Sequence, residues 1–348
     1  MTAILALMSA LAFVVSFQIA RKISINGQKL GLIQVPNHRS SHYKPTVSGG
    51  GLGIAVAGTL LVLPSLAGAH AMMTWAILVS AVGGLVGFLD DRLDLPARYR
   101  IVLHVLLVGM LIYVTLGLSA PGFTIDGIVA LLTWGTVLFL GVWWINLFNF
   151  MDGIDGIAAS EAIFILGAAA SFVVLGDFGD ASWTVVLPLC VVAAACMGFL
   201  LLNWPPARVF MGDAGSNYLA FFTLSMALIS FANGYISGAI WVILPAAFVS
   251  DATVTLFRRI LAGERWFAAH REHTYQRLSR RWNGHLKVTL LYAAINMLWL
   301  FPLAFLARNQ SSMDWLIALV AYCPLVVLCI AAQAGLSDRP ATNGRKRT

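Results

Sequence analysis

Charged residues are scarce in this 348-residue chain, and their scarcity excludes the commonest class of protein, the water-soluble domain. Asp, Glu, Lys and Arg make up 11% of the sequence, whereas hydrophobic residues make up 59%. A soluble domain carries about 25% charged residues, because water must solvate its surface. This chain has too few charges to cover itself, so we expect lipid to face most of it. A soluble enzyme, a disordered chain and a disulfide-rich secreted module are thereby excluded.

Cysteine is also rare, and its placement gives no sign of a disulfide framework or a metal site. The four cysteines form no CxxC pair, have no histidine nearby and lie inside apolar stretches: Cys190, Cys196, Cys323 and Cys329. We interpret them as packing residues. No convincing internal repeat is found either, which weakens the case for a transporter built from duplicated halves.

Long apolar stretches account for most of the chain. A helix needs about 20 apolar residues to cross the hydrocarbon layer. Eleven stretches qualify, near 1–20, 48–68, 71–89, 101–118, 127–149, 157–175, 183–202, 214–232, 235–257, 287–307 and 313–334. The first lacks a basic leading segment and a cleavage site, so we expect it to be retained. The prediction is an all-α polytopic membrane protein of about 11 transmembrane helices, with one integral-membrane domain over 1–336.

The basic residues predict the orientation, because cytoplasmic loops of membrane proteins are enriched in Lys and Arg. Of the 22 basic residues, 21 fall in alternate loops or in the tail, and only Arg308 lies on the other side. We therefore expect the N-terminus outside and the C-terminus in the cytoplasm. The cytoplasmic loops are predicted at about 21–47, 90–100, 150–156, 203–213 and 258–286. A disordered basic tail is predicted over 337–348, and nucleic acid is not an expected partner.

Acidic residues gather at the same predicted face, which is costly beside apolar helices and so favours a function. Asp90 and Asp91 end one apolar stretch, and adjacent carboxylates repel each other unless a cation or proton lies between them. Mg²⁺ suits an all-oxygen site that accepts substrate phosphate. The alternative is a solvated acidic pair neutralised by Arg92 and Arg98.

Two further acidic motifs follow later apolar stretches. Asn146, Asn149, Asp152 and Asp155 recur every three residues, which predicts a polar row along a helix and its last turn. Gly153 and Gly156 in that turn would allow positive φ or close approach of a ligand. The third motif places Asp213 between glycines at a predicted helix start, where free N–H groups can bind phosphate. It can equally be an ordinary helix cap. The GGGLG run at 49–53 has the same two interpretations, anion binding or close helix packing.

A basic loop near the C-terminal third completes the set. His270 and His273 lie one helical turn apart with Arg271 between them, and Trp266 and Phe267 just before them predict an interfacial anchor. Zinc binding is one interpretation of the HxxH spacing, although no third ligand is evident. Attraction to anionic headgroups is another. Phosphate binding fits better, because arginine offers bidentate contacts. The motifs together suggest metal-assisted phosphoryl chemistry on a lipid.

In this order, the motifs resemble those of the polyprenyl-phosphate N-acetylhexosamine-1-phosphate transferases, the MraY/WecA superfamily or glycosyltransferase family 4. The similar segments are PNHRSSHYKPTVSGGGLG, FLDDRLDLP, NLFNFMDGIDGIAA, NWPPARVFMGDAGS and AHREHTYQRL, within residues 35–280. The resemblance implies transfer of a sugar-1-phosphate from a UDP-linked N-acetylated sugar to undecaprenyl phosphate, with release of UMP. It also implies Mg²⁺, or Mn²⁺ in its place, as cofactor, and a homodimer is plausible for such a family.

The resemblance also assigns roles to residues. Asp213 and Asp91 are expected to bind the metal, and Asp90 to deprotonate or orient the lipid phosphate. The other expected catalytic residues are Asp91, which forms an essential pair with Asp90, and Asp152 and Asp155. Substrate binding is expected from Asn146, Asn149, His42, His270, Arg271 and His273.

One departure from the family's sequence pattern concerns the identity of the donor sugar. Many WecA-like members carry a run of histidines after the position of His273, whereas Thr274, Tyr275 and Gln276 follow here. That resembles the WecA- and WbpL-like branch that initiates O-antigen, whose donors include UDP-FucNAc and UDP-QuiNAc beside UDP-GlcNAc. The alternative function is a cation- or proton-coupled transporter, which would place acids near the middle of the bilayer. A scaffold in a polysaccharide assembly complex is a third interpretation.

Overall fold

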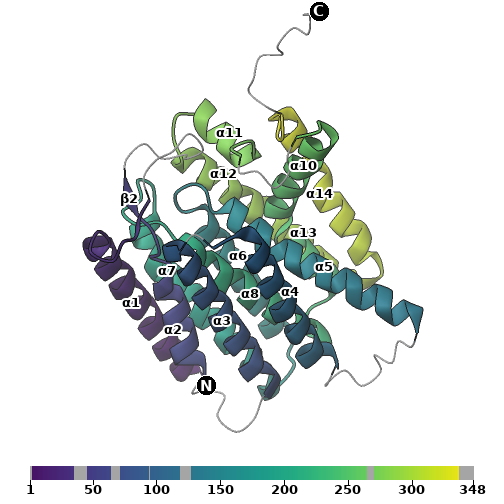
Figure 1. Cartoon of the computed structure of the whole chain (residues 1–348). Coiled ribbons are helices and arrows are strands. Elements are labelled where there is room, and N and C mark those ends of the chain that lie inside the picture. The colour runs from purple at the N-terminus through teal and green to yellow at the C-terminus, as the bar shows by residue number, and fades with distance from the viewer. Residues whose placement is uncertain are drawn as a thin grey trace, which may run out of the picture.

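The computed structural model describes residues 2–34, 45–63, 71–93, 95–117, 127–264 and 270–336. The elements, in chain order, are α1 (Thr2–Asn26), β1 (Ile33–Gln34), β2 (Thr46–Val47), α2 (Leu52–Val62), α3 (Ala71–Leu93), α4 (Ala97–Ile112), α5 (Ile128–Met151), α6 (Ile157–Leu175), α7 (Trp183–Asn203), α8 (Gly212–Ala232), α9 (Gly238–Ile243), α10 (Ala246–Leu261), α11 (Thr274–Arg281), α12 (Leu286–Ile295), α13 (Phe301–Asn309) and α14 (Asp314–Ala331). Two π-helical turns, Tyr113–Gly117 and Asn296–Leu300, extend α4 and join α12 to α13, and short 3-10 turns, Asp180–Ser182 and Ser311–Met313, precede α7 and α14. The all-α prediction is confirmed, since the described strands form a single two-stranded antiparallel sheet (Figure 1).

Nine helical segments in the described part of the chain are long and apolar enough to cross a membrane. The predicted spans at 48–68 and 235–257 differ from the other nine. The first corresponds to α2, an apolar helix of 11 residues ahead of the undescribed stretch 64–70. The second is broken between α9 and α10 at Leu244 and Pro245, because proline has no N–H to continue the helical ladder. The count of eleven and the orientation of the termini therefore stay predictions.

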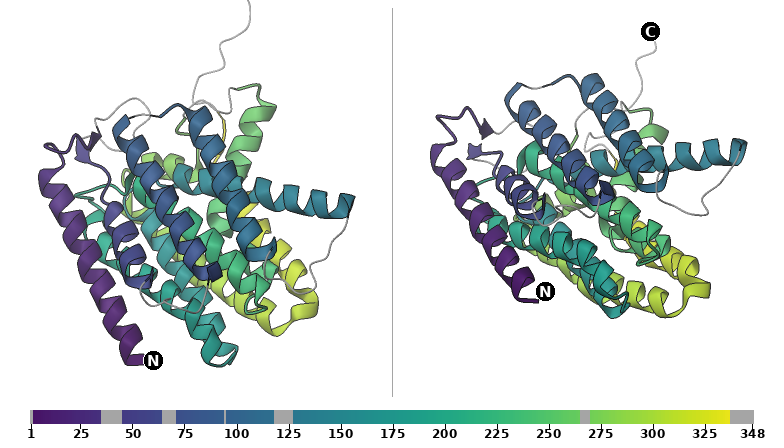
Figure 2. Two further views of the ribbon diagram at one scale, coloured as in Figure 1. Left: turned by 60° about the horizontal axis from the view of Figure 1, so that its bottom comes forward. Right: turned by 90° about the horizontal axis from the view of Figure 1, so that it is seen from below.

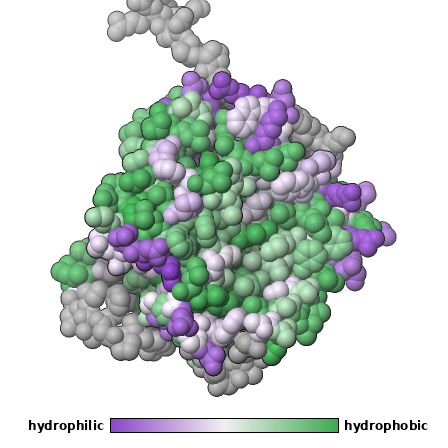
Figure 3. Space-filling view, turned by 180° about the vertical axis from the view of Figure 1, so that it is seen from behind, coloured by the Kyte–Doolittle hydropathy of each residue, from purple (hydrophilic) through white to green (hydrophobic). Residues whose placement is uncertain are grey.

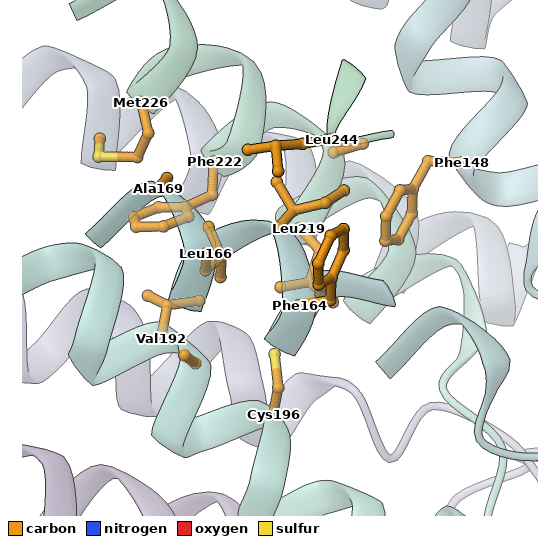
Figure 4. Packing of buried hydrophobic residues seen from close by; sticks show 14 of the residues in the cluster. Phe148, Phe164, Leu166, Ala169, Val192, Cys196, Leu219, Phe222, Met226 and Leu244 are labelled. Atoms are coloured by element: carbon orange, nitrogen blue, oxygen red, sulfur yellow. The ribbon is translucent and has the colours of Figure 1, made fainter. Parts of the chain in front are cut away.

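The bundle is built around α8, whose residues are mostly buried. Its aromatic and aliphatic side chains pack against α5, α6 and α7, as Figure 4 shows for Leu219 and Phe222 beside Phe148, Leu166 and Val192. On the outside, apolar side chains are exposed on many helices. Figure 3 shows hydrophobic residues over most of the rear face, with the hydrophilic ones in separate patches. Such a surface fits a lipid environment, so the chain is a multi-pass membrane protein.

Glycines bring α3 and α8 unusually close together. Gly83 and Gly87 form a GxxxG spacing on α3, and small residues at this spacing let helix backbones approach each other. A side chain at Gly83 would collide with the ring of Phe221, and one at Gly87 would collide with the backbone of Asp213. Gly87 lies one turn before Asp91, so this contact sets the end of α3 against the start of α8.

The end of α5 lies on one side of this contact, and α5 extends sideways from the bundle (Figure 2). At the same end, the segment 204–211 after α7 joins the small sheet, because Phe210 donates to the carbonyl of Val47 at 2.8 Å and accepts from Gly50 at 2.9 Å. Four of the predicted loops thus meet at one end of the bundle.

Candidate functional site

Asp91 caps the first turn of α8. Its two carboxylate oxygens accept the N–H groups of Asp213 and Ala214, at 2.9 and 3.1 Å. A carboxylate at this position satisfies two otherwise unpaired donors and interacts favourably with the helix dipole. Of the two interpretations of this motif, the structure therefore favours a capped helix start over a phosphate site, because Asp91 engages these N–H groups. Gly212, with φ of +73°, forms the turn that aims these groups at Asp91.

Arg100 lies between two of the carboxylates. Its Nη1 is 2.6 Å from Oδ2 of Asp90 and 3.4 Å from Oδ2 of Asp213, although the two aspartates are far apart in sequence. Asp90 is buried and also accepts the N–H of Leu95 at 2.8 Å. The alternative was that Arg92 and Arg98 neutralise the acidic pair. For Asp90, the structure does not show this contact. The guanidinium of Arg100 provides this positive charge instead.

Asn149 supplies the polar partner of Asp213 from α5. Its Nδ2 donates to Oδ1 of Asp213 at 2.8 Å and to the hydroxyl of Ser216 at 3.1 Å. The side chain of Asp213 remains 28% exposed, so it can still reach a ligand. Asp90 and Asp91 from α3, Asn149 from α5 and Asp213 from α8 thus form one cluster, which we call the acidic site.

Asp152 lies directly after the last residue of α5 and is half-buried. Its carboxylate accepts no hydrogen bond from the part of the chain that the structure describes. Burial raises the pKa of Asp152 well above its usual range, and the nearby charges of Asp213 and Asp91 raise this pKa further. A cation close to this carboxylate would favour its ionised form.

Asp155 makes structural contacts on the other side of the turn. Its Oδ1 lies 3.1 Å from Nδ1 of His285, and its Oδ2 accepts the N–H of Ala207 at 3.1 Å. Asn203 holds the same turn, because its Oδ1 accepts the N–H of Gly156 at 2.9 Å. Gly156 has φ of +76°, as the sequence predicts.

Asn146 does not join the acidic site. Its Nδ2 donates back to the carbonyl of Val142 at 2.7 Å, within its own helix. The predicted polar row therefore breaks after Asn149, because α5 ends at Met151 and the following turn redirects Asp155. The catalytic role of Asp155 and the binding role of Asn146 stay predictions.

A buried aspartate of α10 positions the basic loop. Oδ1 of Asp251 accepts the N–H of Thr274 at 2.7 Å, and Oδ2 accepts the N–H of Tyr275 at 3.0 Å, so this carboxylate caps α11. Asp251 is fully buried, and His273 Nδ1 lies 3.5 Å from it. The imidazole of His270 stacks on that of His273 with ring centroids 4.8 Å apart. Burial, with repulsion from His273 and Arg259, lowers the pKa of His270 to about 3.

Tyr275 joins this loop to the acidic site. Its hydroxyl donates to the carbonyl of Phe150 at 2.9 Å, and Phe150 directly follows Asn149 of the acidic site. Gly153 is required at this contact, since a side chain there would collide with the Tyr275 hydroxyl. The glycine was predicted to allow positive φ or close approach of a ligand, and the structure shows close approach of a tyrosine.

This contact gives a direct test. We expect Gly153→Ala to lower the thermal melting midpoint, because overpacking a buried contact costs about 1–3 kcal/mol. The loss should be smaller in a Tyr275→Phe background, where the colliding hydroxyl is gone. A double-mutant cycle of melting midpoints checks the coupling. Strictly additive losses would show that the two residues do not meet.

Of the two remaining predicted site residues, the structure describes Arg271. Arg271 is exposed, and its carbonyl accepts Nη1 of Arg280 at 2.8 Å. His42 lies outside the described residues, as do Trp266 and Phe267.

The glycines of the 49–53 run pack closely: a side chain at Gly51 would lie 2.5 Å from Cα of Gly215. Close packing is therefore the interpretation that the structure favours for this run.

Within the described residues, no three His, Cys, Asp or Glu side chains are arranged to hold a metal by themselves. Mg²⁺ needs fewer protein ligands, because it keeps several waters and binds through one or two carboxylates plus substrate phosphates. The donor set fits that mode: Asp213 is partly exposed, Asp152 is free of hydrogen bonds from the described chain, and both belong to one group of repelling carboxylates.

Sequence reasoning missed the residues that connect the motifs to one another. In the sequence, Arg100 is one of the basic residues that predict the orientation, and no pattern singles out Asn203 or His285. Arg100 follows Asp90 by ten residues across Leu95 and Pro96, and that spacing was the one available signal.

A cluster of carboxylates at one end of an apolar helical bundle defines a class, the integral membrane proteins with an acidic site at one end of their helices. Comparison with known proteins shows a similarity to one family. Residues 73–231, which run from α3 to α8 and include the acidic site, match the model of glycosyl transferase family 4. The part of the chain that contains the acidic site is therefore similar to this family, and this similarity supports the resemblance to the MraY/WecA superfamily.

Several relatives carry informative descriptions. A probable undecaprenyl-phosphate N-acetylglucosaminyl 1-phosphate transferase of Bacillus subtilis is 26% identical, over 94% of this chain and 90% of its own. A decaprenyl-phosphate N-acetylglucosaminephosphotransferase of Mycolicibacterium smegmatis is 28% identical, over 89% and 83%. A phospho-N-acetylmuramoyl-pentapeptide-transferase of Desulforamulus reducens is 33% identical, over 47% and 53%.

Proposed function

We propose that the chain transfers an N-acetylated sugar-1-phosphate from a UDP-sugar to undecaprenyl phosphate at the cytoplasmic face of a bacterial inner membrane. The observation that carries the proposal is the convergence of Asp90, Asp91, Asn149 and Asp213 from three helices at one end of an apolar bundle. Two relatives that align over most of their length are described as polyprenyl-phosphate sugar-phosphate transferases. The products would be undecaprenyl-diphosphate-sugar and UMP.

In this proposal, Asp90 and Arg100 orient the lipid phosphate, whose oxygen attacks the β-phosphorus of the UDP-sugar. Asn149 holds Asp213 in place through its amide, and Asp91 fixes the start of α8 beneath them. Mg²⁺, or Mn²⁺ in its place, would be held by Asp213 and Asp152 and would neutralise charge on the diphosphate. Asp91 was also predicted as a ligand, but both its oxygens already accept backbone N–H groups.

His270 and Arg271 are proposed to contact the diphosphate or sugar. His273 is buried against Asp251, so it supports His270 by stacking. We further propose that the chain initiates O-antigen synthesis, with UDP-GlcNAc, UDP-FucNAc or UDP-QuiNAc as donor, since Thr274, Tyr275 and Gln276 replace a run of histidines. The backbone N–H groups of Thr274 and Tyr275 are engaged by Asp251, and the hydroxyl of Tyr275 donates to the carbonyl of Phe150.

A panel of donors tests this proposal. Purified protein in detergent would receive undecaprenyl phosphate, Mg²⁺ and, one at a time, UDP-GlcNAc, UDP-GalNAc, UDP-FucNAc and UDP-QuiNAc, with UMP release as the readout. We expect release with one donor or a related pair, dependent on lipid and abolished by EDTA. Silence with every donor from folded protein, together with uptake of solute into proteoliposomes, would favour the transporter alternative.

A further inference from the structure

A groove lies away from the acidic site, between α1 and the end of α7. Its volume is about 550 Å³, which is within the usual range of about 300–1,000 Å³ for small-molecule sites. Apolar residues of both helices line it, among them Phe17, Leu201 and Trp204, and two arginines, Arg21 and Arg208, stand beside them. None of these residues belongs to the acidic site or to the basic loop. α1 lies on the outer flank of the bundle, where lipid would reach it (Figure 2).

The positive charges beside the groove favour the binding of an anion. Both arginines are exposed, and neither forms an ion pair with any residue that the structure describes. The first 89 residues contain no Asp or Glu, so the N-terminal part of the chain has no acid to neutralise Arg21. Two guanidinium groups beside an apolar wall complement a phosphate that carries hydrocarbon, because arginine binds phosphate through paired hydrogen bonds.

The position in the bundle matches the depth of a lipid headgroup. Arg21 directly follows the apolar part of α1, and Phe17 lies one helical turn before it. Trp204 directly follows the last residue of α7. Arginine and tryptophan at helix ends commonly lie at the membrane–water interface, the level of lipid phosphates. From these observations we propose that the groove binds the phosphate headgroup of an anionic glycerophospholipid, with acyl chains along Phe17 and Leu201.

Such a lipid would connect α1 to the acidic site through the segment after α7. The hydroxyl of Ser24 on α1 donates to the carbonyl of Arg208 at 3.2 Å, and Ala207 donates to Asp155. Five residues after Arg208 stands Asp213. A headgroup held by both arginines would therefore steady the segment that leads into α8. This consequence rests on the proposed function, whereas binding of the lipid does not.

Native mass spectrometry of the full-length protein in detergent tests the binding. Phosphatidylglycerol and phosphatidylcholine would be titrated into wild type, Arg21→Gln, Arg208→Gln and the double variant. Lys22→Gln/Lys29→Gln is the matched control, because it removes two exposed positive charges, one in the last turns of α1 and one just after this helix, and neither residue lines the groove. We expect wild type to prefer phosphatidylglycerol, each single variant to lose about fivefold in affinity and the double variant to lose more than tenfold, with the control within twofold.

Equal loss in the control, an unaltered double variant, or no headgroup preference in wild type would each overturn the proposal. Competition decides the source of the phosphate. Displacement of phosphatidylglycerol by millimolar inorganic phosphate would show a site for the free anion. Equimolar displacement by undecaprenyl phosphate would show an acceptor site instead. Because the readout is binding, a protein that binds the lipid but releases no UMP would sustain this inference while failing the proposed function.

Discussion

Asp213→Asn is expected to reduce UMP release by about 1,000-fold, the size of effect seen when one preorganised electrostatic contact to a transition state is removed. The substitution keeps the shape of the side chain and leaves Oδ1 able to accept from Asn149 at its present 2.8 Å. What it removes is one negative charge from a group of carboxylates that approach one another around Arg100. The chemistry should be lost while the fold is kept.

Thermal melting separates these two outcomes. Without divalent cation, we expect Asp213→Asn to melt at or above the temperature of the wild type, because a mutually repelling charge is gone. With millimolar Mg²⁺, the wild type should gain stability by ligand linkage and the variant should gain less. Asp314→Asn, at the start of α14, is the control and should keep full activity. An active Asp213→Asn protein would contradict the assignment of the acidic site and would favour the scaffold interpretation.

Asp251→Ala is expected to produce the largest loss of stability in the chain. Its carboxylate accepts four hydrogen bonds while fully buried, from the backbone of Thr274 and Tyr275, the hydroxyl of Tyr292 at 2.6 Å and that of Thr255 at 3.2 Å. Truncation leaves buried donors without a partner, and each costs about 1–3 kcal/mol. We therefore expect a total of at least about 3 kcal/mol.

Because Asp251 caps α11, the same variant should also loosen His270 and His273. If that loop contacts the UDP-sugar, KM for the donor should rise by about tenfold or more, with a smaller change in kcat. Thr255→Ala removes only the longest of the four bonds and serves as the matched control, with little change in melting or KM. A normal melting midpoint for Asp251→Ala would show that α11 does not depend on this cap.

The all-α membrane architecture could be predicted from the sequence, and so could several residues that the structure brings together. Apolar stretches of membrane-spanning length predicted nine of the helical segments, and the one-sided distribution of Lys and Arg predicted which loops share a face. Asp213 and Asn149 were both selected, and the structure joins them directly. These features follow from composition and local periodicity, which a single sequence contains.

The long-range partners could not be predicted from the sequence. The helix start at Asp213 offers N–H groups to any anion, and only the packing at Gly87 shows that Asp91 takes them. In the sequence, Arg100 contributes only to the prediction of the orientation. In the structure, the turn at Leu95 and Pro96 places it beside Asp90. Asp155 belongs to the same sequence motif as Asp152, but the turn after α5 places its carboxylate beside His285.

The most direct test of the central claim follows the phosphorus atom. The donor would be a UDP-N-acetyl sugar labelled with ³²P at the β-phosphate, incubated with the protein, undecaprenyl phosphate and Mg²⁺, then extracted into butanol. Transfer of a sugar-1-phosphate predicts that the label enters the lipid phase in step with UMP release, and that neither occurs with Asp213→Asn. Label that remains in the aqueous phase while UMP is released would show hydrolysis of the donor, and would contradict the account of this chain as a polyprenyl-phosphate sugar-1-phosphate transferase.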